Sequence, residues 1–136
     1  MLATNLTGNY PSSVDWGTNT ATSPAIDLTG ATSPQLSFYV WLSSESSYDG
    51  FNLKISTDGT TFTLVPDADV VPTYSGTIGP TGGTESAWYG GTSSWVKYTA
   101  NLSAYAGSTV YLRFDFRSDV SSTYAGAYVD DLLIVQ

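Results

Sequence analysis

Carboxylate side chains gather in two short segments of this 136-residue chain, and they are the groups best suited to chemistry. Glu45 and Asp49 lie in a serine-rich segment just before Gly50, and Asp130 and Asp131 are adjacent near the C-terminus. Calcium takes roughly six to eight oxygen ligands from carboxylates, backbone carbonyls and water, so these acids could hold it. They equally fit a turn at Asp49-Gly50 and a strand-end acceptor at Asp130. The residues alone leave both interpretations open.

Aromatic residues form the second group that could bind a ligand. Trp88 and Tyr89 adjoin in a glycine-rich segment, Tyr74 lies upstream of them, and Tyr124 lies in the last predicted loop. Exposed rings stack on the apolar faces of sugars or anchor a partner protein. Alternatively, each ring covers one end of the hydrophobic core. We therefore treat these four residues as a candidate ligand-binding set with a structural alternative.

The composition argues against catalysis. The chain has no histidine and no cysteine, so the commonest general base, the commonest transition-metal ligand and thiol nucleophiles are absent. A glycosidase needs two carboxyl groups across a cleft, and the chain has only two glutamates, Glu45 and Glu85. Because Glu85 lies in a glycine-rich segment without a predicted strand, a small glycosidase is a remote alternative. We predict that the domain is not an enzyme.

The charge balance excludes further classes of partner. Lys and Arg number 4 against 12 Asp and Glu, which gives a net charge of −8. With no basic stripe to neutralise phosphates, we expect neither nucleic-acid binding nor attraction to anionic membranes. No apolar run reaches the roughly 18 residues of a membrane span, and the first residues do not form a signal peptide. We interpret Met1 as the start of an excised or mature segment.

Alternation of apolar and polar residues predicts an almost entirely β chain. The pattern is clearest from Gln35 to Leu42 and again over 51–64, where an Asp58-Gly59 turn joins two strands as a hairpin. Further strands are predicted over 23–28, 96–102, 110–116 and 127–135, and one more around Asn5 or Val14.

Seven or eight short strands in a single domain spanning 1–136 predict an antiparallel β-sandwich. The spacing fits both jelly-roll and immunoglobulin-like topologies. The segment 66–94 holds three of the six prolines and six of the thirteen glycines. We therefore expect a long irregular loop there.

An ordered set of six sequence phrases resembles a known family. The phrases are Ser23 to Gly30, Leu36 to Phe38, Tyr48 to Gly59, Trp95 with Asn101 to Gly107, Val110 to Phe114, and Gly126 to Asp131. Over residues 16–136 the chain resembles the jelly-roll accessory domains of secreted bacterial proteins, such as those attached to immune inhibitor A metallopeptidases, and more distantly MAM domains. Each phrase is weak alone, and their common order makes the resemblance specific.

The resemblance implies a non-catalytic jelly-roll domain, secreted or at the cell surface, that often holds a structural calcium ion. It implies Glu45, Asp49 and Asp130 as calcium ligands. Asp131 is the weaker candidate, because neighbouring strand residues point to opposite faces of a sheet. The acidic residue that the family often carries on its first strand is missing from residues 3–7.

We therefore expect an adhesion or targeting module with calcium as its cofactor. Its partners would be a glycan or a cell-surface protein, together with neighbouring domains of a larger chain, without membrane insertion. The alternative is a carbohydrate-binding module that uses the loop aromatics.

Overall fold

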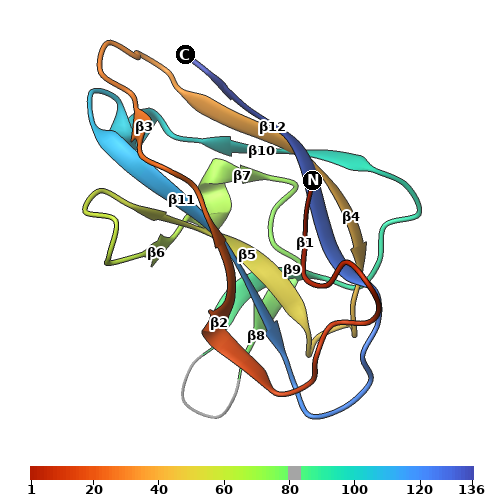
Figure 1. The fold of residues 1–136 in the computed structure, drawn as a ribbon. Coiled ribbons are helices and arrows are strands. Elements are labelled where there is room, and N and C mark those ends of the chain that lie inside the picture. Colours follow the sequence, from red (N-terminus) through yellow and green to blue (C-terminus); the bar gives the residue numbers. More distant parts are fainter. Residues whose placement is uncertain (80–83) are drawn as a thin grey trace.

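The apolar faces of the predicted strands pack against each other in two antiparallel sheets (Figure 1). This computed structural model describes residues 1–79 and 84–136. The first sheet, called sheet A, has the strand order β1 (Leu2–Ala3), β12 (Gly126–Val135), β4 (Gln35–Ser43), β10 (Val96–Asn101), β7 (Val70–Val71). The expected all-β antiparallel sandwich is confirmed.

Sheet B forms the opposite layer. Its order is β2 (Val14–Thr22), β11 (Thr109–Ser118), β5 (Gly50–Ser56), β9 (Glu85–Tyr89), β8 (Gly76–Ile78), with β3 (Ile26–Asp27) on β11 and β6 (Thr63–Leu64) on β5. The helical turns that the structure describes are two short 3₁₀ segments, η1 (Asp67–Asp69) and η2 (Ser103–Tyr105). No helix among the described residues is long and apolar enough to cross a membrane.

The segment 66–94 differs from the long irregular loop that the sequence predicted. It contains η1 and the strands β7, β8 and β9. These strands are short. β8 pairs with its neighbour β9, whereas β9 also pairs with β5, and β7 pairs with β10, both distant in sequence. Pairing with distant strands supplies backbone hydrogen bonds to β7 and β9, and the alternation of apolar and polar residues within the segment does not predict it. Residues 80–83 lie outside the described part of the chain.

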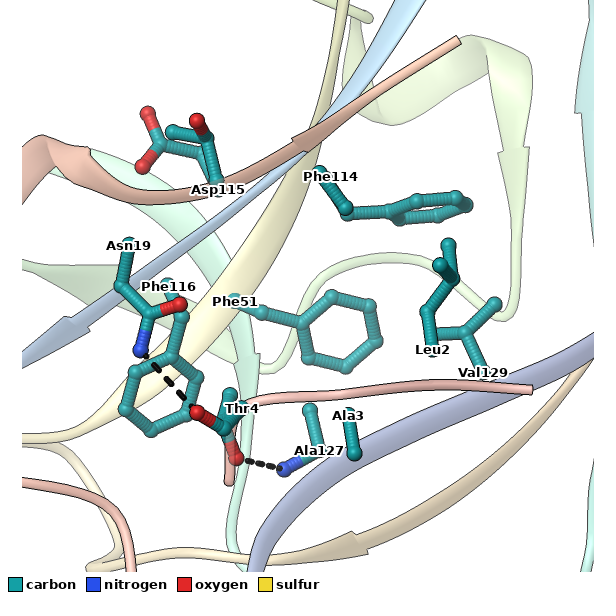
Figure 2. Close-up of a pocket in the computed structure, with 12 residues that line it drawn as sticks. Leu2, Ala3, Thr4, Asn19, Phe51, Phe114, Asp115, Phe116, Ala127 and Val129 are labelled. Atoms are coloured by element: carbon teal, nitrogen blue, oxygen red, sulfur yellow. Dashed lines mark hydrogen bonds between the residues drawn. The ribbon is translucent and has the colours of Figure 1, made fainter. Parts of the chain in front are cut away.

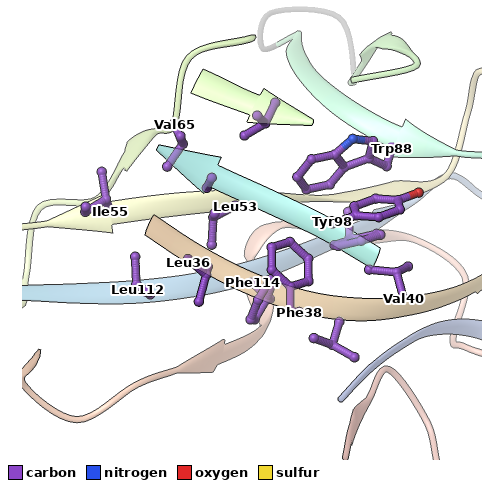
Figure 3. Packing of buried hydrophobic residues seen from close by; sticks show 14 of the residues in the cluster. Leu36, Phe38, Val40, Leu53, Ile55, Val65, Trp88, Tyr98, Leu112 and Phe114 are labelled. Carbon is purple, nitrogen blue, oxygen red and sulfur yellow. The ribbon is translucent and has the colours of Figure 1, made fainter. Parts of the chain in front are cut away.

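The core lies between the two sheets, where the inward-facing side chains of β4, β5 and β11 meet (Figure 3). Phe38 of β4 lies at its centre, and its ring centroid is 5.1 Å from that of Phe114 on β11 and 6.2 Å from that of Trp88 on β9. A fully buried side chain of this size stabilises the fold by about 1.5–3 kcal/mol. This packing fixes the strands from which the polar residues of both faces project.

Strand register brings two loops, the one between β4 and β5 and the one between β11 and β12, to one end of the sandwich. Arg117 of β11 pairs with Gly50 at the start of β5, and Ser43 at the end of β4 pairs with Gly126. A side chain at Gly50 would collide with the backbone oxygen of Trp88, because a Cβ there would lie only 2.3 Å from it. The loops that precede β5 and follow β11 are therefore held side by side.

Candidate metal centre

Three carboxylates meet at this end of the sandwich. Glu45 and Asp49 come from the turn between β4 and β5, and Asp119 directly follows β11. Each contributes one oxygen to a group whose members all lie within 4.8 Å of one another. We call Glu45, Asp49 and Asp119 the acidic cluster.

The turn between β4 and β5 places the first two acids. The amide N–H groups of Tyr48 and Asp49 both donate to the backbone oxygen of Glu45, at 3.3 and 3.0 Å. The hydroxyl of Ser44 donates to the backbone oxygen of Asp49 at 2.7 Å. Because the turn closes on itself in this way, the side chains of Glu45 and Asp49 face the same space.

Asp49 is the fixed centre of the cluster, with 0% of its surface exposed. Its Oδ2 atom accepts a hydrogen bond from the Tyr10 hydroxyl at 2.7 Å, and its Oδ1 atom accepts one from the Asp119 backbone N–H at 2.6 Å. The ring of Tyr10 packs against Phe116, 4.8 Å away between centroids. The N-terminal segment, the β4–β5 turn and the end of β11 are thus tied together through one carboxylate.

The negative charge of the cluster is only partly compensated. Burial raises the pKa of Asp49, which exceeds the lowering by hydrogen bonds from Asp119 N–H and the Tyr10 hydroxyl and by the charge of Arg117. Burial and the charges of Asp119 and Asp49 raise the pKa of Glu45. Burial, together with the adjacent Asp49, also raises the pKa of Tyr10. Negative charge here is therefore costly to keep without a cation.

One ligand atom of the cluster has no partner within the described chain. Glu45 is half-buried, yet its Oε2 atom is buried and makes no hydrogen bond. A buried polar atom without a partner costs about 1–3 kcal/mol, so such atoms are rare. Three carboxylates, one of which has a buried oxygen without a hydrogen-bond partner, match the ligand chemistry of calcium, and backbone carbonyls and water would complete the shell.

Asp130 and Asp131, the other two predicted metal ligands, do not join the acidic cluster. Asp130 pairs with Tyr39 in the middle of β12, and its Oδ1 atom lies 3.0 Å from the N-terminal amino group. Asp131 lies in a bulge of β12 with φ +50°. β12 enters sheet A at Gly126, opposite Ser43, and has moved along β4 away from Glu45 before it reaches these acids. The sequence reasoning also missed Asp119, which becomes a candidate only when β11 and β5 are known to pair.

The predicted ligand-binding aromatics divide in the structure. Trp88 and Tyr74 are core residues, 1% and 6% exposed, with ring centroids 4.3 Å apart. Trp88 Nε1 donates to the Pro72 oxygen at 2.9 Å, so its polar atom is satisfied inside the fold. Tyr89 is half-buried and its hydroxyl donates to the Ser75 oxygen, whereas Tyr124 is exposed. A shared platform of these four rings is therefore not formed, because β9 turns Trp88 into the core.

Three aromatic rings, one exposed and two half-buried, gather instead on the outer face of sheet A. Tyr39 and Trp41 alternate with the core residues of β4, and Trp41 pairs with Tyr128 of β12. The rings of Trp41 and Tyr128 meet edge to face at 5.5 Å. We call Tyr39, Trp41 and Tyr128 the sheet A aromatic face.

Two hollows on the molecule lie apart from the acidic cluster. A cavity of about 60 Å³ lies beneath β1. Phe51, Phe114 and Phe116 are among the residues that line it (Figure 2). There, Thr4 Oγ1 accepts a hydrogen bond from the Ala127 N–H and Asn19 Nδ2 donates to the Thr4 oxygen (Figure 2). A larger apolar groove of about 460 Å³ lies along β12, β2 and β3. Glu45 and Glu85 line neither hollow.

Sequence comparison with known proteins matches nearly the whole chain to one family. The model of the family described as "Immune inhibitor A-like, MAM domain" matches residues 9–135. Bacillopeptidase F of Bacillus subtilis (strain 168) is 30% identical over 134 residues, which cover 98% of this chain. The same alignment covers 8% of Bacillopeptidase F, so the chain corresponds to a small part of that relative.

Proposed function

The chain belongs to the immune inhibitor A-like MAM domain family, and on this premise we propose that it is a non-catalytic accessory domain with a structural calcium ion. It would act as an adhesion or targeting module within a longer secreted or cell-surface protein. Its partners would be a cell-surface protein or glycan and the neighbouring domains of that chain.

The match to a peptidase supports the accessory role. Bacillopeptidase F is named as a peptidase, and this chain aligns with only 8% of it. The chain itself has no histidine and no cysteine, and its two glutamates lie in different places. Glu45 belongs to the acidic cluster, whereas Glu85 of β9 binds Lys54. These two glutamates therefore do not form the pair of carboxyl groups across one cleft that a glycosidase requires.

The observation that carries the calcium proposal is the buried Oε2 atom of Glu45, without a partner beside Asp49 and Asp119. A divalent cation would accept electron pairs from the three carboxylates and relieve their repulsion. It would also join the turn before β5 to the end of β11. The role of such an ion is therefore to hold loops together, with no part in a reaction.

A thermal melt in excess EDTA and in millimolar calcium tests this site. Bound calcium should stabilise the fold by RT ln(1 + [Ca²⁺]/Kd), which is about 2.7 kcal/mol at a hundredfold excess over Kd. We expect a midpoint higher by several degrees in calcium, with magnesium having a smaller effect because it holds its water more tightly. Equal midpoints in EDTA and calcium would refute the site.

A second candidate function is glycan binding on the sheet A aromatic face. Tyr39 is exposed, Trp41 and Tyr128 are half-buried, and Trp41 and Tyr128 are paired across β4 and β12 on the outer face of sheet A. Aromatic rings in such an arrangement offer stacking surface to the apolar faces of sugar rings. This candidate replaces Trp88 and Tyr74 of the original set with residues that solvent reaches.

Titration with a panel of polysaccharides, followed by tryptophan fluorescence, tests glycan binding. We expect a saturable change that Trp41→Ala abolishes. Tyr124→Ala, which removes an exposed ring elsewhere, serves as the control and should bind normally. A panel without any saturable change eliminates this candidate and leaves the calcium proposal standing.

A further inference from the structure

A second set of charged residues lies on the outer face of sheet B, apart from the acidic cluster. Lys54 is on the central strand β5, Asp115 is on β11 to one side of it, and Glu85 is on β9 to the other. Asp115 pairs directly with Asn52, two residues before Lys54, so Lys54 and Asp115 are diagonal neighbours on one face. We call Lys54, Asp115 and Glu85 the lysine cluster.

The amine of Lys54 touches both carboxylates. Its Nζ atom lies 2.8 Å from Asp115 Oδ2 and 2.7 Å from Glu85 Oε2. Lys54 is 8% exposed and Asp115 is 1% exposed. Glu85 is held by a further hydrogen bond from Asn52 Nδ2 at 3.0 Å, and Asn52 is fully buried. An amine is therefore fixed against a carboxyl group, largely out of water, with a second carboxylate on the same nitrogen.

Strand β2 covers the cluster and adds a hydrogen-bond donor. The backbone N–H of Gly17 points at Asp115, 2.8 Å from Oδ1 and 3.0 Å from Oδ2. Gly17 has φ +82°, a conformation that glycine adopts readily and that directs this N–H toward the carboxyl group. The ring of Trp16 lies over Lys54, 5.0 Å from Nζ to the ring centroid. Backbone donor and aromatic cover come from consecutive residues.

We propose that Lys54 and Asp115 condense to an amide, an intramolecular isopeptide bond that links β5 to β11. The four parts that such a reaction needs are present: a nucleophilic amine, a carboxyl carbon beside it, an N–H for the developing oxyanion, and a carboxylate to carry protons. The fold already holds the amine against the carboxyl group, so the entropic cost of bringing them together is met on folding. This lowers the barrier of an otherwise slow condensation.

The reaction balances as a loss of one water. The Lys54 ammonium transfers one proton to Asp115 Oδ2, which leaves a neutral amine and a neutral carboxylic acid. Nζ then attacks Cγ of Asp115, and the oxyanion forms on Oδ1, which accepts from the Gly17 N–H. Glu85 takes a proton from Nζ and delivers it to the hydroxyl on Cγ. The C–O bond breaks, water leaves, the amide forms, and Glu85 is again a carboxylate.

The bond would suit this chain physically. It would close a loop between residues that are 61 positions apart in sequence, in a protein without cysteine for a disulfide. Closing a long loop removes conformations from the unfolded chain, as a disulfide does. It also removes two opposite charges from a buried position, where each is costly.

Mass spectrometry of the purified, intact chain tests the proposal. We expect a mass lower by one water than the sequence mass, after allowance for removal of Met1. Lys54→Arg and Glu85→Gln should show their full sequence masses, and Asp115→Asn should lose ammonia in place of water. Lys97→Arg changes an exposed lysine and should still lose water.

Fragmentation identifies the bond. An Asp-Gly step such as Asp58-Gly59 can also lose water by closing to a succinimide, so the lost water must map to two linked peptides that carry Lys54 and Asp115. Folded wild-type chain with the full sequence mass would overturn the proposal. A loss of water that maps to an Asp-Gly step would overturn it equally.

Discussion

The acidic cluster at the loop end of the sandwich and the lysine cluster on sheet B are both built from buried or half-buried carboxylates, but only the second contains its own ammonium group. In the lysine cluster, Nζ of Lys54 lies within 2.8 Å of oxygens from two acids. In the acidic cluster, three carboxylates face one another and Arg117 only partly offsets them. The lysine cluster therefore has its counter-charge within the chain. The acidic cluster would need a cation from outside for the same balance.

Because of this difference, we expect the stability of the two regions to depend on different conditions. The lysine cluster should be insensitive to chelators and should fail when its own residues change. The acidic cluster should respond to calcium and to pH, because its cost depends on whether the carboxylates carry charge. Four predictions test this division, beginning with the largest effect.

Lys54→Met should destabilise the fold most. The substitution removes the amine that the proposed bond requires and leaves Asp115 buried without its charged partner. Breaking a buried ion pair in this way costs about 3–5 kcal/mol, and loss of the bond would add to that cost. Denaturation with urea measures the loss. Lys97→Met, at an exposed position, is the matched control and should change stability little. If Lys54→Met is as stable as wild type, the lysine cluster contributes nothing to the fold.

Asp119→Asn should abolish the stabilisation by calcium, about 2.7 kcal/mol at a hundredfold excess over Kd. The variant loses one of three charged ligands while keeping the shape of the side chain and the backbone N–H that binds Asp49. Melts with EDTA and with calcium give the difference. Asp131→Asn removes an acid outside the cluster and should keep the full calcium effect. A calcium effect of wild-type size in Asp119→Asn would place the ion elsewhere.

The pH dependence should reverse with calcium. The pKa values of Glu45 and Asp49 are raised above their usual 4.5 and 3.8, so the folded chain without metal binds protons more readily than the unfolded chain. In EDTA, stability should therefore rise as pH falls from 7 toward 4.5, and be lost again as pH rises. In calcium, protons compete with the ion and the same acidification should destabilise.

Urea titrations at several pH values, with and without calcium, measure both slopes. Glu45→Gln should flatten the EDTA curve and raise its midpoint at neutral pH, because one repelling charge is gone. Parallel curves in EDTA and calcium would contradict the assignment of these acids to an ion site.

Asp130→Asn should have the smallest effect. Its carboxylate pairs with the N-terminal amino group at the surface, where both partners are nearly half exposed and solvent screens the pair, so its contribution to stability is small. The calcium response should be unchanged. Loss of that response would return Asp130 to the ligand set that the sequence suggested.

Much of the fold could be predicted from local pattern. The alternation from Gln35 to Leu42 became β4, and the hairpin around Asp58-Gly59 became β5 and β6. In each case every second residue is apolar, because side chains alternate between the two faces of a sheet and one face must be buried. The strands of 70–89 were missed because their pairing partners, rather than their own residues, make them strands.

The candidate site was predicted in part. Glu45 and Asp49 belong to one turn, so their proximity follows from short sequence separation. Asp119 was missed because it is 70 residues from Asp49, and only the β5–β11 register brings them together. Trp88 was taken for a loop aromatic because glycines flank it, whereas its burial depends on β9 joining sheet B.

The sequence by itself determined the chemistry available to this protein: carboxylates and hydroxyls, no histidine or cysteine, and a net charge of −8. Tertiary structure decided which acids meet. Burial of the two core faces sets the strand register. The register in turn fixes the positions of polar residues at strand ends and on outer faces, which contribute little to setting it. That is why Asp119 joined Glu45 and Asp49, and why Lys54 came to lie between Asp115 and Glu85.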